Sequence, residues 1–394
     1  MLRATKDITL PTTITGSLPR PSWFTVNQGS RSFLDAMVNS VFREQYTDAV
    51  GAYLSDQELA GLDIVTDGDA HFDQEVGGQS WTNYPTRHMK GFNHGDPRIT
   101  PAGKGGLAFP PGHILHDYLE ARVMPAIVGP VGRGDLQYPE MWKVAQRMTN
   151  KPVKFGTIGP ELVAFAVADR HYKDVRERIY ALADALNEEL HALADAGCEV
   201  IQFEEPQIHL LAARGIVDDV INPAFSVDVH NRTVKGLRDK TEVWCHTCWG
   251  NPSQQRMFAQ VQSYKSALDV INKVDADVVT FESCSAGGID LEAFGKHITD
   301  KKIAIGVIDH HTLQVERPEE IADHIRKALK YIPAERLVIS SDCGMGREGM
   351  SRRHAYYKMV SLVRGTNMVR KELGVPEAQV LAADPRFSLV PITK

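Results

Sequence analysis

The feature that most constrains the fold of this chain is a regular alternation between short β-branched runs and longer helical patterns. Such alternation is typical of a parallel sheet built from strand–helix–strand units. Eight runs are predicted to be strands: Thr12–Ser17, Ile64–Gly68, Val153–Ile158, Glu199–Glu204, Glu242–Thr247, Val278–Ser283, Ile303–Ile308 and Leu337–Ser341. Eight strands with intervening helices favour an α/β fold closed as a (β/α)8 TIM barrel, with an open doubly wound sheet as the alternative.

Helical patterns lie between these strands. Apolar residues recur at spacings of three and four over Asp174–Ala196, which predicts an amphipathic helix. A second helix is predicted over Pro318–Tyr331, where the proline suits the first helical turn. The chain has 394 residues, a length that barrels of this kind reach when they carry insertions. We therefore expect residues 1–394 to form a single barrel domain.

The segment from about Trp81 to Asn150 departs from the alternation. It is rich in glycine and proline, and it is too long for an ordinary connection between two elements. Its aromatic residues argue against disorder; they include Trp81, Tyr84, Phe92 and Phe109. We predict that residues 81–150 are an insertion after the second strand. It forms a lid over the barrel mouth, an arm that contacts another subunit of a homo-oligomer, or a surface excursion without function.

Composition and charge exclude several classes of partner. The 44 Lys and Arg residues stand against 50 Asp and Glu, and no long basic run is present, so we do not expect a nucleic acid partner. No apolar stretch reaches the roughly 20 residues needed to cross a membrane. The cysteine count of five is odd and the N-terminus lacks the apolar core of a signal peptide, so we expect reduced thiols and a cytoplasmic location. The expected partners are small molecules.

Polar side chains follow almost every predicted strand. In a barrel the C-terminal ends of the strands surround one cavity, so these side chains are expected to lie close together. Acidic groups there are costly unless they are paired, which indicates a cationic partner such as a metal ion or a substrate ammonium. Taken singly, each has an ordinary explanation as a helix cap, an ion pair or a backbone hydrogen bond. The strand-end residues are Gly16–Ser17, Asp67–Asp69, Glu204–Glu205, His246–Cys248, Glu282, Asp309–His311 and Asp342–Gly344.

Four of these residues form a candidate metal site. His246 and Cys248 are two apart in a predicted strand, so their side chains point the same way. Glu282 and Cys343 each end a separate apolar run. An imidazole, two thiolates and a carboxylate make a soft, roughly tetrahedral set that suits Zn²⁺. The His-x-Cys pair alone is better explained by a buried cysteine and a hydrogen-bonded histidine, but four such residues at strand ends favour a metal.

The strand-end motifs resemble those of the catalytic barrel of cobalamin-independent methionine synthase, from Leu10 to about Leu373. The similar stretches are Thr12–Ser17, Ile201–Pro206, His246–Cys248, Glu282 and Asp342–Gly344. The resemblance implies that His246, Cys248, Glu282 and Cys343 bind zinc. It also implies a homocysteine site and a proton-moving motif: Gly16, Ser17, Asp69 and Glu204 hold the amino acid part, and His311 with Asp309 moves protons.

The ligand set predicts thiol chemistry. Coordination to zinc removes the proton of a thiol, and the resulting thiolate attacks an electrophilic carbon. A hydrolytic zinc site instead activates water at an open position beside three protein ligands. We therefore predict a zinc-dependent thiol S-methyltransferase, most similar to the enzyme that methylates homocysteine to methionine. Glu282 is expected to be the labile ligand that yields to the substrate sulfur.

Several departures from the family leave the methyl donor open between a folate, methylcobalamin and other donors. The chain has no room for the second, N-terminal half of the full-length enzyme. The family's tryptophan that stacks on folate has no counterpart in Gly159–Ala166. Asp69 stands where the family usually has glutamate, and Glu204 stands where it has aspartate.

Two other functions compete with homocysteine methylation. The stretch Leu18–Phe24 is similar to one in the epoxyalkane:coenzyme M transferases, which join a thiol to an epoxide. The carboxylates of Asp69 and Glu204 favour a substrate with an ammonium group, since they would repel a sulfonate thiol. Arg20 offers a fork that suits a carboxylate or sulfonate. A metal-storage protein would need no substrate pocket, and the predicted insertion speaks against it.

Overall fold

The computed structural model describes most of the chain. The described residues are 3–29, 31–71, 80–93, 126–213, 215, 219–250, 261–346 and 349–384. Within this part no helix has the length and apolar character needed to cross a membrane.

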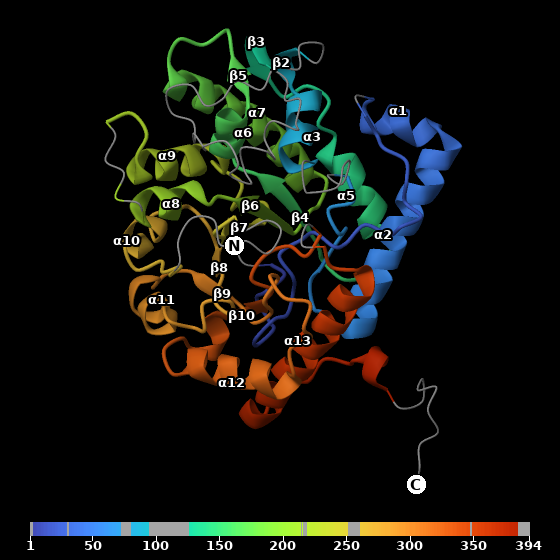
Figure 1. Cartoon of the computed structure of the whole chain (residues 1–394), viewed down its shortest axis with the longest axis vertical. Helices are drawn as coiled ribbons and strands as arrows, with labels where there is room; N and C mark the ends of the chain where they lie inside the picture. The colour runs from blue at the N-terminus through green and yellow to red at the C-terminus, as the bar shows by residue number, and fades with distance from the viewer. Residues whose placement is uncertain are drawn as a thin grey trace.

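A curled sheet of seven parallel strands forms the centre of the molecule, and helices surround it (Figure 1). In spatial order the strands are β1 (Val65–Thr66), β4 (Val153–Ile158), β6 (Val200–Glu204), β7 (Glu242–Thr247), β8 (Val278–Phe281), β9 (Lys302–Gly306) and β10 (Leu337–Ser340). Their spatial order follows the chain order, so successive strands lie side by side. Seven of the eight predicted strands are present, and their ends differ from the prediction by no more than two residues.

The eighth predicted strand, Thr12–Ser17, is extended chain that closes the ring. Thr12 forms a single parallel bridge with Ile339 of β10, and the Thr13 N–H donates to the Ile339 carbonyl at 3.0 Å. On the other side, the N–H groups of Asp63 and Ile64 donate to the Thr12 carbonyl, each at 3.1 Å. The Asp63 carboxylate takes the Thr12 N–H at 2.8 Å, which interrupts a regular strand ladder. The expected TIM-barrel-like α/β fold is therefore confirmed.

Along each strand, side chains point in turn toward the barrel interior and toward the surrounding helices. A small apolar cluster fills the interior, distinct from the larger core between the sheet and the helices. Its members are Ala4, Ile64, Val200, Trp244, Val278, Ala304 and Val338. Two residues further along the strands, the inward positions become polar, as at Gln202 and His246. The interior is thus apolar where this cluster lies and polar where the strands end.

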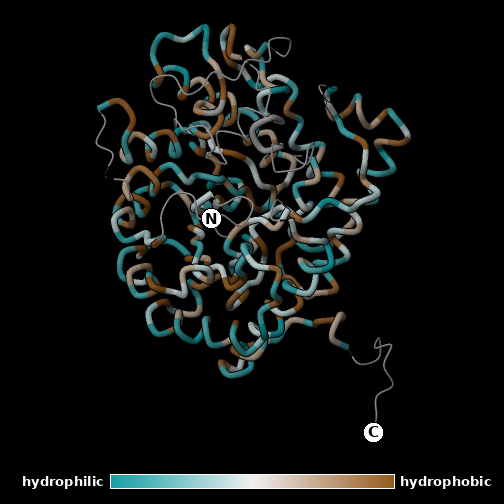
Figure 2. The backbone as a smooth tube through the Cα atoms, in the orientation of Figure 1, coloured by the Kyte–Doolittle hydropathy of each residue, from teal (hydrophilic) through white to brown (hydrophobic). Residues whose placement is uncertain are grey.

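The helices form an outer ring, and hydrophobic and hydrophilic stretches alternate along their backbone (Figure 2). The predicted helices appear as α7 (Val175–Asp195) and α12 (Pro318–Leu329). Asp174 caps α7 by accepting the Arg176 N–H, and Pro318 occupies the first turn of α12. Outside the insertion, the other helices of the described residues are α1 (Phe33–Val38), α2 (Ser40–Ala60), α6 (Pro160–Ala166), α8 (Gln207–Ala213), α9 (Pro223–Thr233), α10 (Leu268–Ile271), α11 (Leu291–His297), α13 (Arg352–Leu373), η2 (Ala334–Arg336) and η3 (Leu381–Ala383).

The predicted insertion, residues 81–150, separates β1 from β4. Its described parts include α3 (Ser80–His88), β2 (Lys90–Asn93), β3 (Ala126–Gly132) and α5 (Tyr138–Gln146). Strand β2 is antiparallel to β3, and β3 is parallel to β5 (Ala168–Asp169), which makes a separate small sheet. Helix α5 contacts α2 and α7. Residues 94–125 lie outside the described part, so a lid or an oligomer contact stays a prediction.

We predict that Asp63→Ala weakens the closure of the barrel. Asp63 Oδ2 accepts from the Thr12 N–H, the Thr12 hydroxyl and the Arg370 guanidinium, at 2.8, 2.8 and 2.6 Å. Loss of this carboxylate leaves the nearly buried Arg370 uncompensated and should lower the free energy of unfolding by about 3 kcal/mol. Asp195→Ala, which breaks a surface ion pair with Lys240, should cost less than about 1 kcal/mol. Urea unfolding of both variants measures the difference, and equal losses would contradict the prediction.

Candidate metal centre and amino acid pocket

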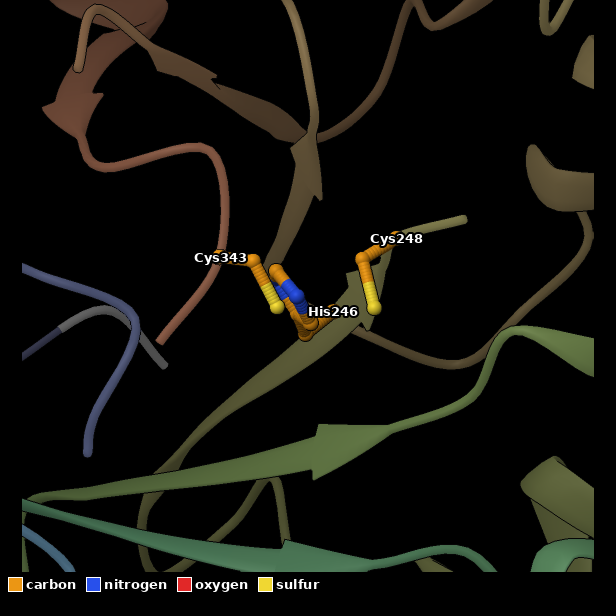
Figure 3. A group of neighbouring side chains, drawn as sticks. All are labelled: His246, Cys248 and Cys343. Atoms are coloured by element: carbon orange, nitrogen blue, oxygen red, sulfur yellow. The ribbon is translucent and has the colours of Figure 1, made fainter. Parts of the chain in front are cut away.

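Three side chains of types that can bind a metal ion come together where β7 and β10 end: His246, Cys248 and Cys343. One ligand atom of each lies within 4.8 Å of the other two, and all three residues are buried. Figure 3 shows that His246 and Cys248 come from β7 and its end, while Cys343 approaches from the loop after β10. Three of the four predicted metal ligands are therefore brought together from two separate parts of the chain.

The imidazole of His246 is oriented by the strands on both sides. In the parallel register it lies between Glu204 of β6 and Thr280 of β8. Its Nδ1 is hydrogen-bonded to Thr280 Oγ1, and its Nε2 lies 3.4 Å from Glu204 Oε2. Burial lowers the pKa of His246, but the Glu204 carboxylate and the Cys248 sulfur outweigh it, so the pKa lies above its ordinary value. The Nδ1 contact leaves Nε2 as the nitrogen available to an ion.

A hydrogen bond between the two cysteines favours the thiolate form of Cys248. A hydrogen bond with Cys343 lowers the pKa of Cys248 well below its ordinary value; burial opposes this shift and His246 supports it. The thiolate is the form of cysteine that binds metals. The Ser341 hydroxyl donates to the Cys343 carbonyl at 2.9 Å and so holds the backbone of this loop. Two sulfur donors and an imidazole in a buried site are a set that zinc favours.

Glu282, the fourth predicted ligand, follows β8 and lies beside this group. Its Oε2 accepts the N–H of Trp249, the residue after Cys248, at 2.6 Å. Its Oε1 lies 3.8 Å from His310 Nε2 and 4.0 Å from His311 Nε2, and these three residues form a second group with metal-ligand spacing. The carboxylate therefore contacts the residue after Cys248 through one oxygen and lies near two histidines through the other. Its role as a zinc ligand stays a prediction.

His311, the predicted proton carrier, forms a pair with Asp309. Asp309 Oδ1 accepts the His311 backbone N–H at 2.8 Å and lies 2.9 Å from its Nδ1. Burial raises the pKa of Asp309, but the hydrogen bonds from His311 outweigh burial and hold the pKa below its ordinary value. Lys358 of α13 secures this loop by donating to the Asp309 carbonyl at 3.0 Å and to Glu316 at 2.8 Å. A carboxylate that fixes Nδ1 leaves Nε2 to exchange a proton.

Gly16, Ser17 and Asp69, predicted to hold the substrate, lie together where the N-terminal segment passes the end of β1. A Cβ atom on Gly16 would lie 2.7 Å from Asp69 Oδ2, so glycine lets this carboxylate approach the backbone. Asp69 has a φ of 54°, a left-handed conformation that few residues other than glycine adopt. Ser17 joins this group to the loop after β10, because its hydroxyl accepts the Gly346 N–H at 3.2 Å.

Glu204, the other predicted pocket residue, is linked to a buried lysine. Its Oε1 accepts from Gln202 Nε2 at 3.1 Å, and Gln202 Oε1 accepts from Lys154 Nζ at 2.7 Å. Burial lowers the pKa of Lys154 to about 7, while the carboxylates of Glu204 and Asp69 oppose that shift. Both predicted ammonium ligands therefore act on the same buried amine. The structure places the four predicted substrate residues around one end of the barrel interior.

Asp342 connects the segments that carry Glu282 and Cys343. Its two carboxylate oxygens accept the backbone N–H groups of residues 283–285 at 2.7 to 2.8 Å. Burial raises the pKa of Asp342 to about 6, and these backbone hydrogen bonds oppose the shift. Because residue 283 follows Glu282 and Asp342 precedes Cys343, this single side chain fixes the spacing between the two segments.

A second acidic pair is buried where β4 and β6 end. Glu161 in the first turn of α6 and Glu205 after β6 are 0% and 1% exposed. Burial raises the pKa of Glu161 to about 8, and burial together with the charge of Glu161 raises the pKa of Glu205 well above its ordinary value. Glu161 accepts a hydrogen bond from the Ser226 hydroxyl at 3.0 Å. The pair therefore retains a proton at neutral pH.

Arg20 is used by its own loop. Its guanidinium donates to the carbonyls of Phe24 and Val26, each at 2.6 Å, and lies 3.7 Å from the centre of the Phe24 ring. The expectation that Arg20 binds a substrate carboxylate or sulfonate finds no support in these contacts.

Sequence reasoning missed Lys154, Gln202 and Thr280. The sequence does mark Lys154, because it is a charged residue within the apolar run Val153–Ile158. It shares one face of that strand with Gly156 and Ile158. Gln202 likewise points to the same face of its strand as Glu204. Thr280 becomes relevant only through its register with His246, which the sequence does not specify.

Comparisons with known proteins find similarity over most of the chain. The family model described as cobalamin-independent synthase, catalytic domain, matches residues 102–364. A methionine synthase of Saccharolobus solfataricus is 30% identical over 92% of this chain and 96% of its own length; one of Thermococcus kodakarensis is 31% identical over 92% and 94%. The solved B12-independent methionine synthase of a Shewanella species, in complex with selenomethionine, is similar with a TM-score of 0.74 and 27% identity, over 93% of this chain and 99% of that one.

We predict that Glu161→Gln changes how stability depends on pH. Glu161 has a pKa of about 8 in the fold against an ordinary value of 4.5, so the folded protein binds this proton more tightly than the unfolded chain. The resulting stabilisation is complete below the ordinary pKa and is lost as the pH rises through about 8. We expect Tm to fall less in the variant than in the wild type between about pH 6 and about pH 9. The exposed Glu177→Gln is the matched control, and a wild-type-like fall in Glu161→Gln would refute the assignment.

Proposed function

Since the chain belongs to the cobalamin-independent synthase catalytic-domain family, we propose that it transfers a methyl group to the thiol of homocysteine, with zinc as cofactor. The observation that carries this proposal is the gathering of His246, Cys248 and Cys343 beside the buried carboxylates of Asp69 and Glu204. The first group suits a soft ion that binds a thiol, and the second suits an ammonium group. Homocysteine carries a thiol and an ammonium group on one small molecule.

The chain's own residues would hold the metal from separate strands. His246 Nε2, Cys248 Sγ and Cys343 Sγ supply three donors, and Glu282 is the proposed fourth. Zinc bound there would supply the Lewis acidity that turns a thiol into a thiolate at neutral pH. The hydrogen bond between His246 Nδ1 and Thr280 Oγ1 keeps the imidazole in place.

The amino acid end of the substrate would be held by carboxylates and backbone. Asp69 and Glu204 are 5% and 4% exposed, so their charges are poorly solvated and gain from an incoming ammonium group. Gly16 leaves room for Asp69, and Ser17 ties the pocket to the loop that bears Cys343. These contacts would therefore hold the carboxylates that bind the substrate ammonium at a fixed distance from the metal ligands that bind its sulfur.

His311 would move the proton that the thiol gives up. Its Nε2 lies 4.0 Å from Glu282 Oε1, next to the proposed metal ligands, while Asp309 holds its Nδ1. This arrangement delivers an imidazole in a defined tautomer to the edge of the site.

The alternative, a thiol alkyltransferase that acts on a sulfonate thiol, gains nothing from the structure. Arg20 is bound to main-chain carbonyls, and the pocket beside the proposed metal ligands presents two carboxylates. These charges would repel a sulfonate.

We predict that Cys248→Ser and Cys343→Ser each lose bound zinc, because each removes a thiolate from the proposed donor set. Metal analysis of purified protein measures the loss. Cys245→Ser is the control, because Cys245 lies on the same strand as His246 and is equally buried, but it belongs to the hydrophobic core outside the barrel interior. Full zinc content in Cys343→Ser would refute the proposed centre, and failure of the zinc-loaded wild type to bind homocysteine would refute the proposed substrate.

We predict that His311→Gln lowers kcat for homocysteine methylation by about a hundredfold or more, the usual size of general acid–base catalysis. Zinc content and the KM for homocysteine should stay close to the wild-type values, because His311 is placed in neither the donor set nor the ammonium pocket. His297→Gln serves as the control, since His297 pairs with Asp269 at the protein surface. A kcat equal to the wild type would show that His311 does not carry the proton.

A further inference from the structure

We infer that Lys154 is a positioning residue that makes the pocket selective for thiols carrying an ammonium group, an inference that rests on the proposed function. It acts through Gln202 on the carboxylate of Glu204. Neither Lys154 nor Gln202 needs to touch the substrate for this role.

Lys154 runs inside the barrel. It is 1% exposed and starts near the N-terminal end of β4, next to the apolar interior cluster. Its Nζ donates to the Ile14 carbonyl at 2.6 Å and to Gln202 Oε1 at 2.7 Å, and lies 4.7 Å from the centre of the Trp244 ring. These contacts fix the ammonium group at one point, directly below the polar end of the interior.

Gln202 transmits this position to Glu204. With its Oε1 occupied by Lys154, the amide of Gln202 has one orientation in which Nε2 donates to both the Thr15 carbonyl at 2.8 Å and Glu204 Oε1 at 3.1 Å. Glu204 Oε1 is thereby engaged from below. The other oxygen, Oε2, is left on the side of His246 and of the proposed metal ligands. The relay therefore sets which carboxylate oxygen faces an incoming substrate.

Charge balance supports the same role. Asp69 and Glu204 are both buried, and both act electrostatically on Lys154. Opposite charges attract strongly in a buried site, so both carboxylates favour an ammonium group at the position of Lys154 Nζ. A lysine inside a barrel is costly to bury, whereas its neighbours in the interior, such as Val200 and Val278, are apolar. A position that needed only volume would be filled more favourably by another apolar side chain.

The test compares two ligands on the zinc-loaded protein: homocysteine, and 4-mercaptobutyrate, which has the same thiol and carboxylate but no ammonium group. Lys154→Met keeps an unbranched side chain one atom shorter and removes the donor. We expect it to raise the Kd of homocysteine about tenfold, the size of one charge-assisted hydrogen bond. The Kd of 4-mercaptobutyrate should stay within about twofold, so the selectivity between the two ligands falls about tenfold.

Two further variants separate positioning from general destabilisation. Lys302→Met removes another nearly buried lysine, which lies on β9 and whose Nζ donates to the Thr5 carbonyl, away from Asp69 and Glu204. It should lower stability without changing the selectivity. Gln202→Met leaves Lys154 in place but cuts the relay, so it should reproduce the loss of selectivity even where Lys154→Met folds poorly.

Calorimetric titration gives the Kd values. Unchanged selectivity in Gln202→Met, or a loss of the same size in Lys302→Met, would overturn the inference while leaving homocysteine methylation intact. If the wild type binds homocysteine and 4-mercaptobutyrate equally, Lys154 has no selectivity to support and the inference is also overturned. If the wild type binds neither ligand, it is the proposed function that fails.

Discussion

The in-register pairing of parallel strands is the constraint on which the site depends. Glu204, His246 and Thr280 lie abreast on β6, β7 and β8, because each parallel pair has its own fixed register. Side chains alternate along a strand, so this register turns all three toward the barrel interior. A shift by one residue on β7 would turn His246 toward the helices and place Cys245 inside, which would remove a metal donor and the contact with Thr280.

Closure of the ring places the remaining site residues beside these three side chains. The extended segment at Thr12 bonds to β10 on one side and to the residues before β1 on the other, although it forms no regular strand. That closure places Ser17 against the loop that bears Cys343, where the N–H groups of Met345 and Gly346 donate to Ser17. Asp342 then fixes the loop after β8 against the end of β10. The candidate metal centre and the amino acid pocket are therefore two parts of one rim.

Electrostatics unites the two parts. Within the described residues, the rim carries buried carboxylates at Asp69, Glu204, Glu282 and Asp342, and they are stabilised in different ways. Backbone N–H groups hold Asp342, an amide relay from Lys154 reaches Glu204, and Glu282 faces two histidines. That division explains why neighbouring carboxylates in one cavity can have separate tasks.

Sequence periodicity determined the strands β4 and β7, the helices α7 and α12, and the strand ends at which functional residues occur, because burial on both faces and helical spacing are local signals. It could not determine that Thr12–Ser17 closes the ring with a single bridge, since Asp63 takes a hydrogen bond that a ladder would use. Tertiary structure alone decided that Glu282 lies between the cysteines and the histidines, and that Lys154 lies beneath Glu204. Both facts depend on contacts between strands distant in the chain, whose register and side-chain directions no local pattern records.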